Sequence, residues 1–123
     1  MLFRRLALAS SVILLALGSA SAADVKAGKK VFKKCKSCHT VKPEKNKVGP
    51  SLHGIIGNAS GSVDGYKYSP ALASAGIVWT DENMAEFLKN PKEYLPGNKM
   101  SFPGLKKDED IQNLIAYIKD KSN

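Results

Sequence analysis

Apolar residues recur at helical spacing near both ends of the chain. The positions that share one face of the first stretch are Val25, Gly28, Val31, Phe32 and Cys35. Asp24 precedes them as an N-cap, so this pattern predicts a helix. A second helix is expected from Asp108, with three acidic residues in its first turn and an apolar face of Ile111, Leu114, Ile115, Tyr117 and Ile118.

A further helix is predicted in the second half of the chain. Thr80 or Asp81 can cap it, Asn90-Pro91 ends it, and its inner face is Met84, Phe87 and Leu88. Residues 40–75 read mostly as loop, with room for a short helical turn near 69–75. The segment "PKEYLPGNKMSFPG" before the last helix is also expected to be loop.

These patterns predict an all-α fold in one domain, since no strand-like alternation is found. The apolar faces are short for a stable core, and a loop of this length is unusual inside a compact domain. Both observations favour a large buried cofactor that organises the chain. Gly28 is unexpected in a helix, where glycine costs roughly 1 kcal/mol relative to alanine, so it indicates close approach of another element.

The first residues have the three-part pattern of a secretory signal peptide. Arg4 and Arg5 are followed by an apolar run over 6–17 and by small residues over 20–22. The run is shorter than the ~20 residues that span a membrane, which argues against an uncleaved anchor. We expect a signal peptide over 1–22, cleavage before Ala23 or Asp24, and a domain over 23–123.

The expected mature domain is basic. Without Arg4 and Arg5 it has 17 lysines and 11 acidic residues, a net charge of +6. It has no arginine to grip phosphate and no regular aromatic interleaving, which argues against nucleic-acid binding. A docking face for acidic proteins is favoured, and simple solubility remains the alternative for any single lysine.

The motif Cys35-Lys36-Ser37-Cys38-His39 contains both cysteines of the chain. A thioredoxin-like pair would need a strand before it, and a zinc site would need His53 as fourth ligand with Cys38 and His39 crowded about one ion. A plain disulfide would close too short a loop to stabilise much. Covalent haem attachment fits the spacing best, because two thiols can reach two vinyl groups while the next imidazole lies under the iron.

If His39 is one axial ligand, the candidates for the other are His53, Met84, Met100 and an open site. Met84 fits the inner face of a helix, where methionine usually fills the core. His53 follows the motif too closely to reach the opposite haem face easily and is expected to lie at the surface or to bond to the backbone. Met100 lies in a loop with no helical pattern to explain it, so we expect Met100 to be the ligand.

The chain resembles the class I cytochromes c, in particular the exported bacterial relatives of mitochondrial cytochrome c. The resemblance covers nearly the whole expected domain through the blocks "GKKVFKKCKSCHTV", "VGPSLHGIIG", "GYKYSPAL", "IVWT", "NPKEYLPGNKMSFPGLKK" and "LIAYIKD". It implies the small cytochrome c fold, with three main helices and long loops wrapped around one covalently bound haem c.

The resemblance also assigns roles to individual residues. It implies thioether bonds at Cys35 and Cys38, with His39 as proximal and Met100 as distal ligand. The Pro50 carbonyl would accept from the His39 ring, and the groups expected to donate to a haem propionate are those of Tyr68 and Trp79. Where the first and last helices cross, the expected neighbours are Gly28, Phe32, Leu114 and Tyr117.

Three positions depart from common patterns in these relatives. Asn58 stands where an arginine is common near the inner propionate, Phe87 where a tyrosine often touches the methionine sulfur, and Leu72 where an asparagine is common in a water-holding network. These changes imply a drier, less hydrogen-bonded haem environment. Their effects on the reduction potential of the haem oppose one another, so no net direction of change in this potential is predicted.

The implied function is that of a soluble periplasmic one-electron carrier, monomeric and not inserted in a membrane. Its partners would be membrane or periplasmic redox proteins with acidic faces, such as a cytochrome bc-type donor and an oxidase or reaction-centre acceptor. The lysines implied around the haem edge, interrupted by Glu93, are Lys30, Lys34, Lys92, Lys99, Lys106 and Lys107. A peroxidase or gas sensor is disfavoured, because no spare histidine or arginine stands near Met100 in sequence.

Overall fold

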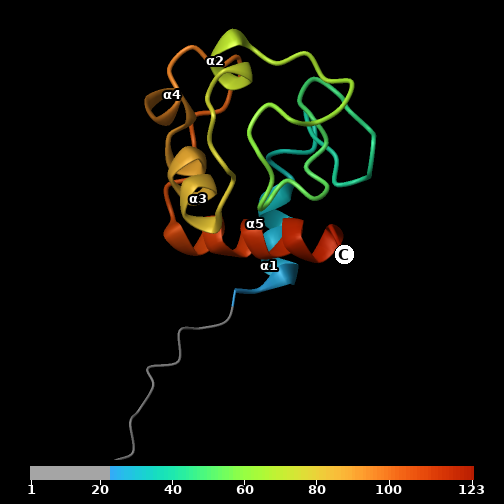
Figure 1. The fold of residues 1–123 in the computed structure, drawn as a ribbon. Coiled ribbons are helices and arrows are strands. Elements are labelled where there is room, and N and C mark those ends of the chain that lie inside the picture. The colour runs from blue at the N-terminus through green and yellow to red at the C-terminus, as the bar shows by residue number, and fades with distance from the viewer. Residues whose placement is uncertain (1–22) are drawn as a thin grey trace, which may run out of the picture.

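Helices joined by long loops make up residues 23–123, the part of the chain that the structure, a computed structural model, describes (Figure 1). The helices are α1 (Val25–Phe32), α2 (Pro70–Ala73), α3 (Asp81–Lys89), α4 (Pro91–Tyr94) and α5 (Asp108–Lys121). The predicted signal peptide over 1–22 lies outside the described residues. Within 23–123 the only β pairing is an isolated bridge between Ala59 and Val78, and none of the helices has the length and apolar character to cross a bilayer. The predicted all-α class is confirmed.

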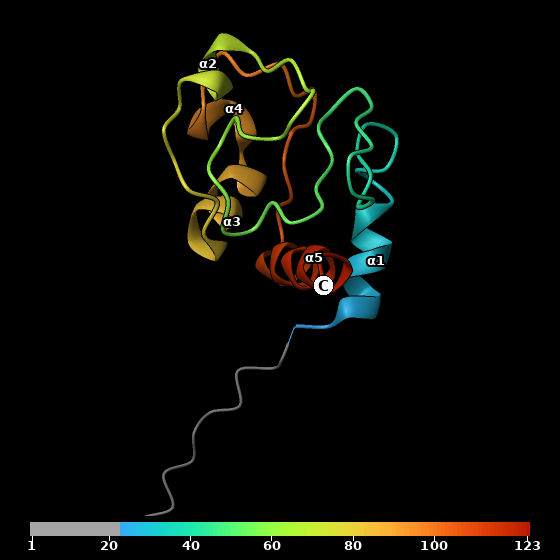
Figure 2. The same cartoon turned by 45° about the vertical axis from the view of Figure 1, so that its right-hand side comes forward.

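Helices α1 and α5 cross at close range (Figures 1 and 2). Gly28 lies at the crossing, where a Cβ atom would be 2.8 Å from Cβ of Tyr117 and would overlap the backbone carbonyl of Asn113. The rings of Phe32 and Tyr117 pack beside it, with centroids 5.4 Å apart. The backbone N–H of Asp24 donates to Oδ1 of the buried Asn113 at 2.8 Å. The unexpected glycine is therefore explained by the crossing itself.

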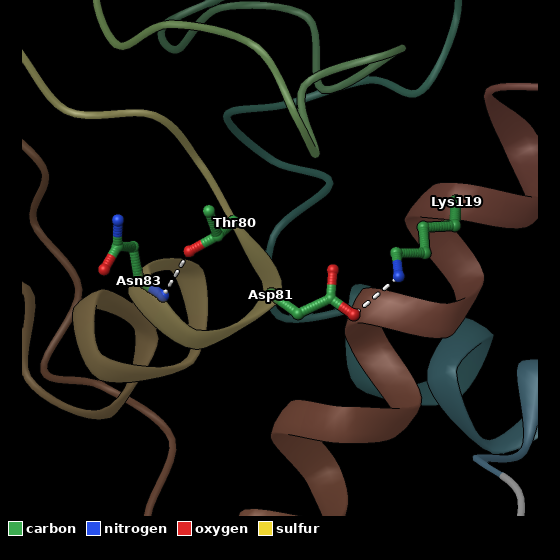
Figure 3. Close-up of polar contacts among 4 residues, drawn as sticks. All are labelled: Thr80, Asp81, Asn83 and Lys119. Atoms are coloured by element: carbon green, nitrogen blue, oxygen red, sulfur yellow. Dashed lines mark hydrogen bonds and ion pairs between the residues drawn. The ribbon is translucent and has the colours of Figure 1, made fainter.

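Helix α3 begins and packs as its sequence predicts. The Oγ1 atom of Thr80 accepts from the backbone N–H of Asn83 at 3.1 Å (Figure 3), which caps the first turn. Asp81 points toward Lys119 of α5, with 2.6 Å between the charged atoms. Both side chains are about half exposed, so this ion pair contributes at most about 1 kcal/mol. Most of the attachment to the core comes from the buried side chains of Met84, Phe87 and Leu88.

The segment after α3 differs from its prediction, because its first turn is helix α4 and not loop. The Asn90 side chain accepts from the backbone N–H of Glu93 at 3.2 Å and caps this helix. Pro91 occupies the first helical position, where a missing N–H costs nothing. Asn90-Pro91 thus ends one helix and starts the next.

The long loop after α1 is held by side-chain hydrogen bonds to its backbone. Oδ1 of Asn46 accepts from the backbone N–H of Ser51 at 2.9 Å, and Nδ2 of Asn46 donates to the carbonyl of Asp64 at 3.0 Å. In both ribbon views this loop and helix α3 stand on opposite sides above α5 (Figures 1 and 2). Residues of all three segments line the cavity described next.

Candidate functional site

A cavity of about 390 Å³ lies among the loop after α1, helix α3, the segment 99–102 and α5. Its walls are largely apolar, with side chains that include Leu52, Ile55, Leu72, Phe87, Leu88, Phe102, Leu114 and Ile118. The predicted site residues that also line it are Cys35, Cys38, His39, Pro50, Tyr68, Trp79 and Met100. The fold thus brings all seven to one cavity, although Cys35 and Met100 are far apart in the sequence.

The motif cysteines stand on a turn that continues from the end of α1. The backbone N–H groups of Cys38 and His39 both donate to the carbonyl of Cys35, at 3.1 and 2.9 Å. The two thiols are free, so they do not form the disulfide considered above. Burial raises the pKa of the Cys35 thiol to about 11, opposed in part by the neighbouring charge of Lys34. At neutral pH this sulfur is therefore uncharged, which suits an apolar wall.

The imidazole of His39 is fixed in one orientation. Its Nδ1 atom lies 2.8 Å from the carbonyl oxygen of Pro50. Because a carbonyl can only accept, Nδ1 carries the proton and Nε2 keeps its lone pair. Burial lowers the pKa of His39, and the charge of Lys47 lowers it further, while the bond to Pro50 acts in the opposite direction. The ring is thus a neutral imidazole with one nitrogen able to ligate a metal.

Gly49 allows the backbone to lie directly against this ring. A Cβ atom at position 49 would be 2.7 Å from Nδ1 and 2.8 Å from Nε2 of His39. Any larger residue would have to displace either the imidazole or the loop. The sequence prediction treated Gly49 only as a loop residue. In the sequence, the available indication that Gly49 lies against His39 was its position next to Pro50, soon after the motif.

The other candidate ligands differ in where they lie. Met100 is partly buried and lines the cavity, and Met84 lines it from α3 as a buried core residue. His53 does not line it, and its Nδ1 lies 3.2 Å from the Val41 carbonyl. Of the two places expected for His53, at the surface or bonded to the backbone, the structure shows the bond to the backbone.

Tyr68 and Trp79 supply polar groups at the cavity wall. The hydroxyl oxygen of Tyr68 accepts from the backbone N–H of Val63 at 2.9 Å, which leaves the hydroxyl proton available to a further acceptor. Burial is the main cause that raises the pKa of Tyr68, so this proton is retained at neutral pH. Trp79 is buried, and its ring packs on Phe87 with centroids 5.0 Å apart.

The three residues that depart from the related sequences do not all lie at the cavity. Phe87 and Leu72 line the cavity, as a drier environment requires. Asn58 is exposed, does not line the cavity, and donates from Nδ2 to the Gly54 carbonyl at 2.6 Å. Its amide is thus directed to the local backbone.

The six predicted docking lysines are all exposed. Lys34 and Lys99 belong to the cavity lining, from the two segments that carry the motif and Met100. Lys106 lies in a separate surface recess together with Glu86, Lys89 and Glu93. The structure therefore places two of the six lysines at the cavity itself. The other four, Lys30, Lys92, Lys106 and Lys107, are exposed but do not line it.

The donor set fits a covalently attached metalloporphyrin. Two free thiols, a neutral imidazole with an available nitrogen and a thioether meet within apolar walls, which are the attachment and ligation groups of haem c. Within residues 23–123 no three His, Cys, Asp or Glu side chains are grouped closely enough to hold a metal ion by themselves. The fold and the site together define a small helical haem protein.

Comparison with known proteins agrees with this class. The family model for cytochrome c matches residues 25–122. Cytochrome c-550 of Nitrobacter winogradskyi is 52% identical over 77% of this chain and 88% of its own. Cytochrome c2 of Blastochloris viridis is 43% identical over 94% of this chain and 92% of its own. The solved structure of cytochrome cH from Methylobacterium extorquens matches with a TM-score of 0.75 and 41% identity, over 80% of this chain and 99% of that one.

The chain belongs to the cytochrome c family, and the class I assignment is confirmed. It is an electron-transfer protein and not an enzyme, and its cofactor is haem c bound covalently. The relatives also include mitochondrial-type proteins, such as cytochrome c of Gibberella zeae, 50% identical over 80% of this chain and 95% of its own. The family therefore does not by itself decide the compartment.

Proposed function

We propose that this chain is a periplasmic one-electron carrier whose haem c is bound through Cys35 and Cys38 and ligated by His39 and Met100. The observation that carries the proposal is the single cavity that these four residues line, with the His39 nitrogen free to ligate. The signal-peptide pattern over 1–22 supports export.

The proposed ligation explains why the site would transfer electrons and perform no other chemistry. With His39 and Met100 both holding the iron, no coordination position would be left open for a substrate. His39 is held by Pro50 and Gly49 in the orientation that a ligand needs, and so reorganises little on oxidation or reduction. The apolar wall excludes water, while Tyr68 and Trp79 offer donors to the propionates. Haem c itself supplies the electron-accepting centre.

The ferric and ferrous forms of the purified holoprotein test this proposal. We expect reversible titration with a one-electron slope, low-spin spectra in both states, and a sulfur-to-iron charge-transfer band in the ferric form. The haem should resist acid-acetone extraction, since thioether bonds survive it. A high-spin ferric spectrum without this band would show that Met100 does not ligate the iron.

We also propose that Lys34 and Lys99, the exposed lysines that line the cavity, guide docking to acidic faces of redox partners. Lys99 lines the cavity and is exposed, so Lys99→Glu should slow electron transfer at low salt by about tenfold and weaken the salt dependence of the rate. Stopped-flow measurement against an acidic redox protein over a range of ionic strengths would show this.

Lys26 provides the matched control for this experiment. It is exposed but does not line the cavity, so Lys26→Glu makes the same change in net charge at another place. Equal effects of Lys99→Glu and Lys26→Glu would mean that only the total charge matters and that the lysines lining the cavity have no special role.

A further inference from the structure

Asn98, which the sequence analysis did not single out, makes three hydrogen bonds around the Met100 segment. Its Oδ1 atom accepts from the backbone N–H of Met100 at 2.9 Å. Its Nδ2 group donates to the carbonyls of Pro91 and Leu95, each at 2.8 Å. The side chain is partly buried and uses both ends of its amide. Asn98 therefore connects the backbone of Met100 with the helix before it.

The carbonyls that Asn98 binds belong to helix α4 and its end. Both carbonyls also accept a backbone N–H, that of Pro91 from Leu95 at 3.0 Å and that of Leu95 from Asn98 itself at 3.3 Å. Because a carbonyl oxygen has two lone pairs, the Asn98 amide adds a second hydrogen bond to each. Helix α4 is itself well anchored, because Pro91 is fully buried and the ring of Tyr94 packs edge-on against Phe87, with centroids 6.2 Å apart. Asn98 thus joins the Met100 segment to a fixed part of the fold.

The Met100 segment has few other polar attachments. Among residues 99–104, the bond from Met100 to Asn98 is the only hydrogen bond in the structure. The next attachment follows at Leu105, whose backbone N–H donates to the Leu88 carbonyl at 2.8 Å. Between these two points, Met100 depends on Asn98 and on apolar packing for its place at the cavity.

We propose that Asn98 is the positioning residue for Met100, the side chain that keeps the methionine sulfur within reach of the iron. This inference rests on the proposed ligation by Met100 and identifies what maintains it. An Asn at this place is suited to the task, because an asparagine side chain readily accepts from the backbone N–H two residues later and still has two donors to offer.

The holoprotein variant Asn98→Ala tests the proposal through competition by imidazole for the distal position. Loss of the three hydrogen bonds favours detachment of Met100, so the apparent imidazole binding constant should rise about tenfold. The charge-transfer band of the ferric form should weaken in parallel. The matched control is Asn90→Ala, which removes the cap at the other end of α4 without touching Met100.

The outcomes separate this inference from the proposed function. If the wild-type ferric protein lacks the charge-transfer band, Met100 is not the ligand and the proposed function fails first. If the band is present but Asn98→Ala binds imidazole no more tightly than Asn90→Ala, the positioning role is wrong.

Amide hydrogen exchange in the wild-type holoprotein provides a test that needs no variant. The Met100 N–H should exchange more slowly than the N–H groups of Lys99 and Ser101, which have no hydrogen-bond partner in the structure. Equal exchange at the three positions would overturn the proposal even if Asn98→Ala does not fold.

Discussion

Replacing Met100 by alanine should abolish the sulfur-to-iron band of the ferric protein while leaving haem c attached. If Met100 ligates the iron as proposed, loss of the thioether would leave that position to water or added ligands, and the ferric state would be stabilised relative to the ferrous state. The reduction potential should fall by a sizeable part of the about 0.8 V range that axial ligands span. Visible spectroscopy and a redox titration of the purified variant would measure both changes.

Met84 offers a matched control for this substitution, since it is a buried methionine that lines the same cavity from α3. The variant Met84→Leu keeps the side-chain volume and should retain the band, with a potential close to that of the wild type. Survival of the band in Met100→Ala, or its loss in Met84→Leu, would transfer the ligand role to Met84.

Replacing Gly28 by alanine should destabilise the holoprotein by about 2 kcal/mol, since the added Cβ must push α1 away from α5. The sign of the change is informative. In a helix without such a neighbour, alanine is more stable than glycine by about 1 kcal/mol, so the same substitution would be stabilising. Guanidinium unfolding followed by far-UV circular dichroism would measure the difference.

Lys29→Ala is the control for that experiment, at the next position of the same helix. Lys29 is exposed, so its replacement should change the free energy of unfolding by less than about 0.5 kcal/mol. A stabilising effect of Gly28→Ala would mean that α1 and α5 are farther apart than the structure has them.

The main helices could be predicted because their signals are local. The apolar spacing in α1, α3 and α5 follows the helical period, and Asp24 and Thr80 cap as their residue types favour. Helix α4 was missed because proline was interpreted as ending a helix, although it also starts one well. The buried Asn113 was missed because its partner, the backbone of Asp24, is remote in sequence.

The residues of the candidate site also fall into two groups, those with a local sequence signal and those whose role depends on contacts remote in the sequence. Cys35, Cys38 and His39 could be found because covalent attachment imposes a fixed spacing within one turn. Met100 has no such local pattern and could be proposed only by eliminating other residues and from the family resemblance, and the cavity now places it with the motif. The roles of Gly49 and Asn98 depend on which atoms lie against them. An asparagine two residues before the expected ligand was the one local signal for Asn98.

The link that Asn46 makes across the long loop has a consequence for the behaviour of the fold in acid. The groups it joins are a side-chain amide, a backbone N–H and a backbone carbonyl, and none of them gains or loses a proton in the range where proteins remain folded. The closure of this loop therefore adds no proton-linked contribution to stability. We expect the attachment between Ser51 and Asp64 to persist when the surroundings become acidic.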